Sequence, residues 1–215
     1  MNRTSAASLR QRALEAARLL RECHPHSTCA LVHHSAHELL VATILSAQCT
    51  DARVNLVTPT LFARWPDAAA LASAPPGELA EAVRSCGFFN QKARAIQEAS
   101  RVIAAEHGGR VPDRLEDLVR LPGVGRKTAN CVLGTWYGRP ALVVDTHMIR
   151  ILGLLGLVSS REPDLIEQEM MALLPPEEWV AFTHRVIDHG RAVCVARRPR
   201  CGDCALAGIC PSRQS

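Results

Sequence analysis

Apolar residues recur at the spacing of an α-helix along almost the whole chain, and this limits the folds it can adopt. Leu14, Ala17 and Leu20 follow this spacing near the start, and Leu39 and Leu40 open a second such run. Residues three and four apart share one face of a helix, so each run provides one face to bury. No alternating run long enough to predict a β-strand occurs. The sequence therefore predicts an all-α fold.

Capping residues and helix breakers set the expected boundaries. Ser35 and Glu38 have the spacing of a capping box, and Thr50 or Asp51 can cap the helix that Pro66 ends. Proline and glycine pairs separate the later helices. Besides a helix near the N-terminus, we predict helices at residues 39–47, 51–65, 76–86, 90–107, 113–120, 126–136, 145–155, 162–174 and 177–190.

Length and composition exclude several classes of protein. The chain has 215 residues, 47% of them hydrophobic and 21% charged, which is typical of a soluble globular protein. Its apolar stretches are too short to span a membrane, and residues 1–21 lack the apolar core of a signal peptide. We expect a cytoplasmic protein. A net charge of +4 permits a polyanionic partner without requiring one.

The chain from Arg191 onward is too poor in apolar residues to pack by itself. It contains four cysteines separated by six, two and five residues: Cys194, Cys201, Cys204 and Cys210. Four soft ligands on so short a segment predict a metal site, although zinc sites usually present two close pairs. Arg197, Arg198 and Arg200 lie between the first two cysteines, where they could meet phosphates. The other five cysteines lack such spacing and are expected to be small buried residues.

Residues 121–125, Leu-Pro-Gly-Val-Gly, form a turn with little side-chain bulk. Its main-chain N–H groups can meet a ligand directly, and a helix beginning near Arg126 adds its positive end. Leu121, Gly123, Val124, Gly125 and Arg126 therefore form a candidate phosphate site, although a plain helix–helix connection would look the same. The order of residues is not that of a nucleotide-binding P-loop.

Only two of the 25 Lys and Arg residues are lysines, Lys92 and Lys127. A lysine can act as a nucleophile and an arginine cannot, so either is a candidate. Lys127 lies in the first turn of the predicted helix beside Arg126. The positive end of the helix and the charge of Arg126 both favour the neutral form of its amine. Asp145 is placed to cap the helix near 145–155. His147 is either a polar residue of that helix start or part of a site.

Three separated motifs resemble the endonuclease III family of helix-hairpin-helix DNA glycosylases. They are LSAQ at 45–48 followed by Thr50 and Asp51, LPGVGRKTAN at 121–130 with VDTH at 144–147, and the four-cysteine tail. The resemblance implies a six-helix lobe at about residues 29–139 and an iron–sulfur cluster lobe from residues 1–28 and 140–215. It also implies that the cysteines hold a 4Fe-4S cluster rather than zinc, and that DNA binds across a groove between the lobes.

The resemblance further implies a reaction. The amine of Lys127 would attack C1′ of a damaged nucleotide, expel an oxidised pyrimidine and form a Schiff base, and β-elimination would cut the strand on the 3′ side. Asp145 would face the site and assist. The partner would be double-stranded DNA with damaged pyrimidines or abasic sites, bound by a monomer.

Reaching C1′ in a duplex requires the nucleotide to turn out of the stack, which leaves a gap to fill. By resemblance, the filling residues correspond to Gln48, Cys86 and Phe88. We predict Phe88 as the wedge and expect that one residue of the pair Phe88 and Phe89 belongs to the core.

Three other functions remain open at this stage. A mismatch-adenine glycosylase relative would lack Lys127 and carry a further C-terminal domain. A non-catalytic helix-hairpin-helix module would use Lys127 only to contact phosphate. An electron-transfer protein built around the cluster would not need the hairpin.

Overall fold

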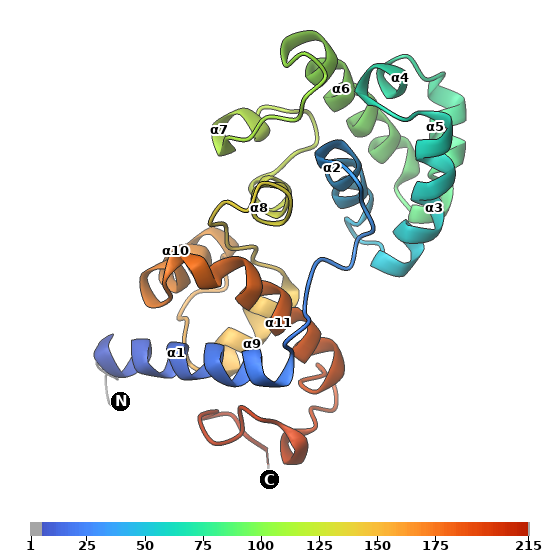
Figure 1. Ribbon diagram of the computed structural model, residues 1–215. Coiled ribbons are helices and arrows are strands. Elements are labelled where there is room, and N and C mark those ends of the chain that lie inside the picture. Colours follow the sequence, from blue (N-terminus) through green and yellow to red (C-terminus); the bar gives the residue numbers. More distant parts are fainter. Residues whose placement is uncertain (1–5, 215) are drawn as a thin grey trace. The chain divides into compact units, whose positions relative to one another are not determined.

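The computed structural model describes residues 6–214, and every regular element within them is helical (Figure 1). The predicted all-α fold is confirmed. The chain separates into two compact units, one formed by Cys29–Arg139 and the other by Met1–Thr28 together with Pro140–Ser215. None of the described helices is both long and apolar enough to cross a bilayer.

The Cys29–Arg139 unit contains the helices that surround the candidate hairpin. They are α2 (Ala36–Leu45), α3 (Asp51–Arg64), α4 (Ala68–Ala72), α5 (Pro76–Ala82), the 3₁₀ turn η1 (Arg84–Cys86), α6 (Phe89–Glu106), α7 (Leu115–Leu118) and α8 (Arg126–Thr135). The short helix α4 is an addition to the six helices expected from the sequence. The helix expected at 76–86 is divided into α5 and η1, and the one expected at 113–120 contracts to α7.

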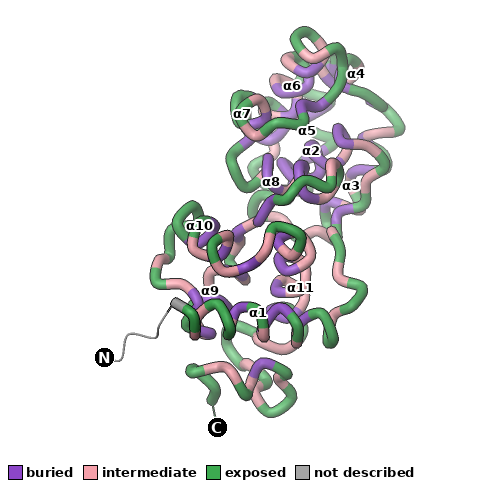
Figure 2. Tube along the Cα trace, turned by 60° about the vertical axis from the view of Figure 1, so that its left-hand side comes forward, coloured by how far each residue is buried: buried purple, intermediate pink, exposed green. Residues whose placement is uncertain are grey.

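Helix α6 lies at the centre of this unit and contacts α2, α4, α5 and η1. Ile96 and Ile103 of α6 and Leu71 of α4 are fully buried, as is Leu79 of α5. Figure 2 shows these helices with their buried faces turned inward. Burying a side chain of this size stabilises the fold by roughly 1.5–3 kcal/mol, so a few such residues fix α6 in place.

Ser35 and Thr50 cap their helices as the sequence predicts, but the capping box at Ser35 is irregular. The Ser35 hydroxyl accepts a bond from the Glu38 N–H at 3.1 Å, and Thr50 caps α3 in the same way. The Glu38 carboxylate accepts from the His34 N–H at 2.7 Å, one residue before the donor that a regular capping box would use. Each cap satisfies a donor that the helix leaves unpaired, which fixes where α2 and α3 begin.

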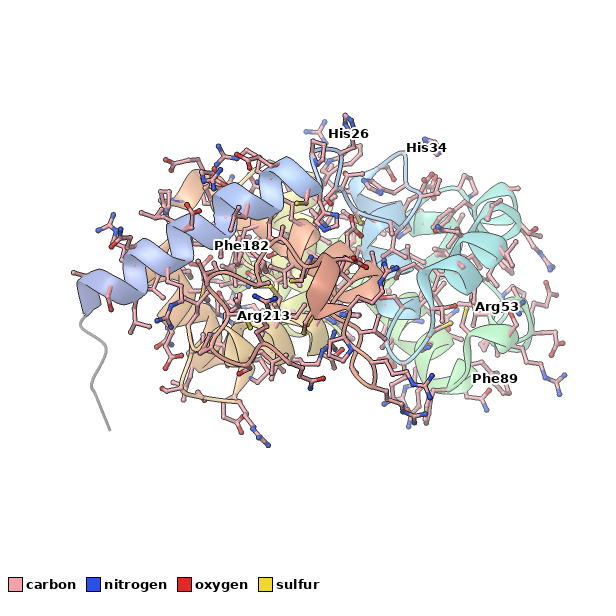
Figure 3. All side chains as sticks on the ribbon, turned by 90° about the horizontal axis from the view of Figure 1, so that it is seen from below. His26, His34, Arg53, Phe89, Phe182 and Arg213 are labelled. Atoms are coloured by element: carbon pink, nitrogen blue, oxygen red, sulfur yellow. The ribbon has the colours of Figure 1, made fainter. Side chains whose placement is uncertain are left out.

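The second unit contains α1 (Ala6–Cys23), α9 (Thr146–Leu154), α10 (Pro163–Leu173), η2 (Pro176–Glu178), α11 (Trp179–Ala192) and η3 (Cys201–Asp203). Its core is formed by apolar residues of α1, α9, α10 and α11 around the fully buried Phe182 (Figure 3). The N-terminal helix and the helices after residue 140 thus share one core. Beyond α11, Leu206 is the one buried residue of the described segment 193–214.

Candidate functional site

The turn before α8 is fixed by its neighbours. Leu121 and Val124 are buried, and the Val124 N–H donates to the Leu121 carbonyl at 3.1 Å. Gly123 has a φ of +74°, and a Cβ there would lie 2.5 Å from the Cβ of Ala95 on α6. Only glycine satisfies both demands. Because the Leu121 and Val124 side chains face the core, these two residues can contribute only main-chain atoms to a ligand.

Helix α8 begins directly after this turn. Its N-cap is Gly125, which has no side chain to offer the first N–H groups of the helix. Arg126 and Lys127 are exposed in the first turn. The positive end of a helix, an arginine and a lysine therefore meet beside a turn that a phosphate oxygen can approach closely.

The two lysines have opposite surroundings. Lys92 on α6 is buried, and its ammonium donates to the Leu45 and Cys86 carbonyls, both at 2.8 Å. An amine engaged in this way inside the unit cannot reach a substrate. Lys127 is exposed, so it is the lysine of the chain whose amine can meet one.

The segments that carry Gln48 and Phe88 share a backbone feature. Both side chains are exposed, and these two are the non-glycine residues of the described chain with positive φ, at +51° and +46°. Such a conformation costs about 1–3 kcal/mol at each residue and is often found where function requires it. The structure therefore places Gln48 and Phe88 at solvent-facing, strained positions, whereas the third gap-filling candidate, Cys86, is buried.

The expectation that one phenylalanine of the pair belongs to the core is wrong. Phe88 is 60% exposed, and Phe89 at the start of α6 is only half-buried. The Arg84 guanidinium lies 5.9 Å from the centre of the Phe89 ring, and Figure 3 shows Phe89 at the outer edge of this unit. Phe88 also has a left-handed backbone, and neither phenylalanine is buried in the core.

A thiol lies one helical turn beyond Lys127. The Thr43 hydroxyl donates to the Cys131 sulfur at 3.7 Å. The pKa of Cys131 is lowered to about 7, chiefly by a hydrogen bond with Cys29. Thr43, Thr135 and Lys127 contribute to this lowering, and burial opposes it. The expectation that the cysteines outside the tail are buried holds for Cys86 alone; Cys23 is exposed, and Cys29, Cys49 and Cys131 are half-buried.

Asp145 in the second unit acts as the N-cap of α9. Its Oδ1 accepts from the Met148 N–H at 2.8 Å, and its side chain is half-buried. The capping role predicted from the sequence is confirmed. The cap uses one carboxylate oxygen and fixes the orientation of the other, so Asp145 can still accept a bond or a proton.

His147, in the first turn of α9, is half-buried and packs against α11. Its Nδ1 lies 3.3 Å from Nη2 of Arg150, which also donates to the Cys194 carbonyl at 2.7 Å. A Cβ at Gly190 would come within 2.4 Å of the same Nδ1, so glycine is required there. Arg150 thus connects the helix of Asp145 to the first cysteine of the tail.

The four tail cysteines are free thiols, and all four are half-buried. Burial raises the pKa of the Cys194 and Cys204 thiols, and the other tail cysteines raise it further. Cys194, Cys204 and Cys210 pack against the core. Within residues 6–214 no three His, Cys, Asp or Glu side chains are arranged to hold a metal ion. Cysteine thiolates are nevertheless the ligand type that iron–sulfur clusters use, so the chemistry of these four residues fits such a cluster.

Arg197, Arg198 and Arg200 are all exposed in the segment between the first two cysteines. Arg200 donates to the Ala192 carbonyl at the end of α11, which fixes one end of this segment. The three guanidinium groups can therefore meet solvent or an anion.

The chain is similar to known DNA repair proteins over most of its length. The family model that describes HhH-GPD superfamily base excision DNA repair proteins matches residues 41–176 of this chain. Endonuclease III of Synechocystis sp. is 51% identical over 97% of this chain and 96% of its own length. Endonuclease III of Escherichia coli strain K12 is 37% identical over 94% and 95%. A solved structure of a trapped endonuclease III–DNA covalent intermediate has a TM-score of 0.91 and 38% identity, covering 94% of this chain and 96% of that one.

Proposed function

Because the chain belongs to the endonuclease III family within the HhH-GPD superfamily of base excision DNA repair proteins, we propose that it is a DNA glycosylase and abasic-site lyase whose nucleophile is Lys127. One observation carries the proposal: an exposed amine stands in the first turn of α8, directly after a turn suited to phosphate. The partner is double-stranded DNA, and the enzyme works as a monomer in the cytoplasm. Its substrates are oxidised pyrimidines and abasic sites.

The reaction begins with the neutral amine of Lys127. Its nitrogen forms a bond to C1′ while the bond from C1′ to the base breaks, and the base leaves with that electron pair and takes up a proton. Opening of the sugar ring gives a Schiff base between Lys127 and C1′. Loss of a C2′ proton then forms the C2′–C3′ double bond as the C3′–O bond breaks, and the phosphate departs. Water hydrolyses the Schiff base and restores the amine.

Asp145 has a supporting role in this proposal. Its Oδ1 is held by the Met148 N–H, so the carboxylate is oriented before substrate arrives. A fixed carboxylate stabilises the positive charge that develops on the sugar as the base departs, and it can accept the proton that the attacking amine loses. His147, in the same helix turn, contributes a contact to the DNA backbone.

The hairpin and the arginines position the DNA. Main-chain groups at Gly123, Gly125 and the start of α8 bind phosphate, while Leu121 and Val124 support the turn from within the core. Arg126 adds a charge at the same place. The arginines of the tail, Arg197, Arg198 and Arg200, bind phosphates elsewhere along the duplex. Such contacts set register without reading sequence.

The four tail cysteines hold a 4Fe-4S cluster in this proposal. Bound by these four residues, such a cluster would supply the cross-links that replace the missing core of the tail. The spacing of the four cysteines, in a segment with one buried residue, supports this assignment.

Borohydride trapping tests the reaction. Duplex DNA with a single abasic site is incubated with the wild type, Lys127→Ala or Lys127→Arg in the presence of borohydride, and the products are separated by electrophoresis. We expect a covalent adduct with the wild type alone. Lys127→Arg is the matched control, because it retains the charge and the phosphate contact but not the nucleophile.

A wild type that binds the duplex and yields no adduct would indicate a non-catalytic helix-hairpin-helix module. An adduct that persists in both variants would assign the reaction to another amine. A panel of duplexes with single lesions, assayed with and without alkali, then separates base removal from strand cleavage and defines the damaged bases that are accepted.

A further inference from the structure

The buried ammonium of Lys92 joins two segments that are far apart in sequence. It projects from α6 and donates to the carbonyl of Leu45 and to the carbonyl of Cys86, each at 2.8 Å. Leu45 is the last residue of α2, and Cys86 is the last residue of η1. The final carbonyls of a helix have no partner within it, and they form its negative end. The buried ammonium of Lys92 provides both of these carbonyls with a hydrogen-bond donor.

The two carbonyls also lie a few residues before the two exposed gap-filling candidates. Gln48 follows Leu45 by three residues, and Phe88 follows Cys86 by two. The segments approach each other at a second point, where Cys49 and Cys86 form a hydrogen bond. Burial raises the pKa of Cys86 to about 11, and Cys49 contributes to this rise. Lys92 thus fixes where each segment leaves the core, on the same side of α6.

This arrangement suits a task that needs two side chains at once. A flipped nucleotide leaves one gap in the stack, and two side chains that enter it must arrive with a fixed separation. Gln48 and Phe88 both have left-handed backbone conformations, which are kept only where the surrounding structure holds them. The bonds from Lys92 provide such a hold for both segments from a single atom, Nζ.

We infer that Lys92 is a positioning residue for DNA opening, which sets the relative placement of Gln48 and Phe88 without touching the substrate. The inference rests on the proposed function, because only an enzyme that opens the duplex needs Gln48 and Phe88 to fill the gap, the role that the sequence predicts for them. It assigns the second lysine of the chain a role through its hydrogen bonds and leaves the attack on the sugar to Lys127.

The test compares an abasic site in duplex DNA with the same site in a single strand, where no gap has to be filled. In Lys92→Met, which removes both bonds and keeps an unbranched side chain, we expect the lyase rate on the duplex to fall by about 10–100-fold. The rate on the single strand should stay within about threefold of wild type. The ratio of the two rates is the readout, because a general loss of folded protein lowers both equally.

Gln97→Met is the matched control. Gln97 also lies on α6 and donates to two main-chain carbonyls, those of Ala72 and Ala74, but the segment that it holds carries no candidate DNA residue. We expect its ratio of duplex to single-strand rates to equal that of the wild type. Thermal unfolding of each variant is measured in parallel, and if Lys92→Met is not folded at the assay temperature, Lys92→Gln, which keeps an N–H donor in the site, replaces it with a smaller fall expected.

The outcomes separate the two proposals. A wild type without lyase activity on either substrate would overturn the proposed function, and the positioning role with it. An active wild type whose ratio is unchanged in the Lys92 variant, or changed equally in Gln97→Met, would overturn the positioning role alone.

Discussion

The hairpin before α8 and the cysteine tail after α11 are both candidate DNA-binding segments, yet they are held in different ways. The hairpin is braced by two buried side chains and by the contact between Gly123 and Ala95. The tail has Leu206 as its one buried residue within 193–214, and three of its cysteines pack against the edge of the core. The hairpin is therefore preformed by packing, whereas the tail has little packing of its own and, in the proposed function, would rely on a cluster bound by its thiols.

The largest expected effect is on the tail. Cys204→Ser removes one of four ligands, so we expect loss of bound iron and a fall in the free energy of unfolding on the order of 5 kcal/mol, because metal binding and folding are coupled. Iron analysis and urea unfolding measure the two. Limited trypsin digestion should then cut the tail at its arginines. Cys23→Ser, at an exposed cysteine of α1, is the control and should behave as wild type.

Breaking the hairpin should cost less. Gly123→Ala places a Cβ against that of Ala95 and forces an unfavourable φ, so we expect a loss of roughly 2–4 kcal/mol in the free energy of unfolding. DNA affinity should fall as well, and iron content should not change. Gly109→Ala has a similar φ of +78° but open space around it, so it should show only the smaller backbone cost. Equal losses in the two variants would mean that the contact with Ala95 does not brace the turn.

Changing charge on the tail should be milder still. Arg197→Ala combined with Arg198→Ala removes two exposed cations. We expect about a 10-fold weaker affinity for duplex DNA and a slope of log affinity against log salt that is smaller by about 2, one for each phosphate contact. Fluorescence anisotropy over a range of salt concentrations measures both. A parallel variant, Arg10→Ala on the exposed face of α1, should leave the slope unchanged.

The smallest effect concerns pH and the unit of the hairpin. Burial lowers the pKa of His37, which bonds to the Ser100 hydroxyl at 3.1 Å, while Asp67 and Glu38 oppose the shift. Below the usual histidine pKa of about 6.5 the unfolded chain takes up a proton that the folded chain resists, so stability falls as pH drops through this range. His37→Phe should make the fall between about pH 6.5 and 5 shallower. An unchanged slope in urea unfolding would show that His37 does not contribute.

What the sequence predicted correctly depends on contacts between near neighbours. Ser35, Thr50 and Asp145 each bind an N–H three residues away, so their caps could be predicted from spacing alone. The turn at residues 121–125 was recognised for the same reason. The contact of Gly123 with Ala95 was not, because it joins α6 to a turn far along the chain.

What the sequence did not predict depends on distant contacts. Neither Phe88 nor Phe89 is buried in the core, and Phe88 has a left-handed backbone, which their composition does not indicate. The bonds of Lys92 join α6 to the ends of α2 and η1, so a pattern along one segment could not show them. Helix α4, only five residues long, is too short for its period to be recognised.

Because the two lysines have different surroundings, Lys127 can be labelled selectively in the folded enzyme. With Lys92 enclosed by main-chain carbonyls, an amine-reactive reagent applied to the folded protein finds Lys127 as its only accessible lysine. Digestion and mass spectrometry would then reveal one modified lysine peptide, and bound DNA would suppress its labelling. Occupancy of the site could be followed in this way without a substrate that reacts and without an engineered tag.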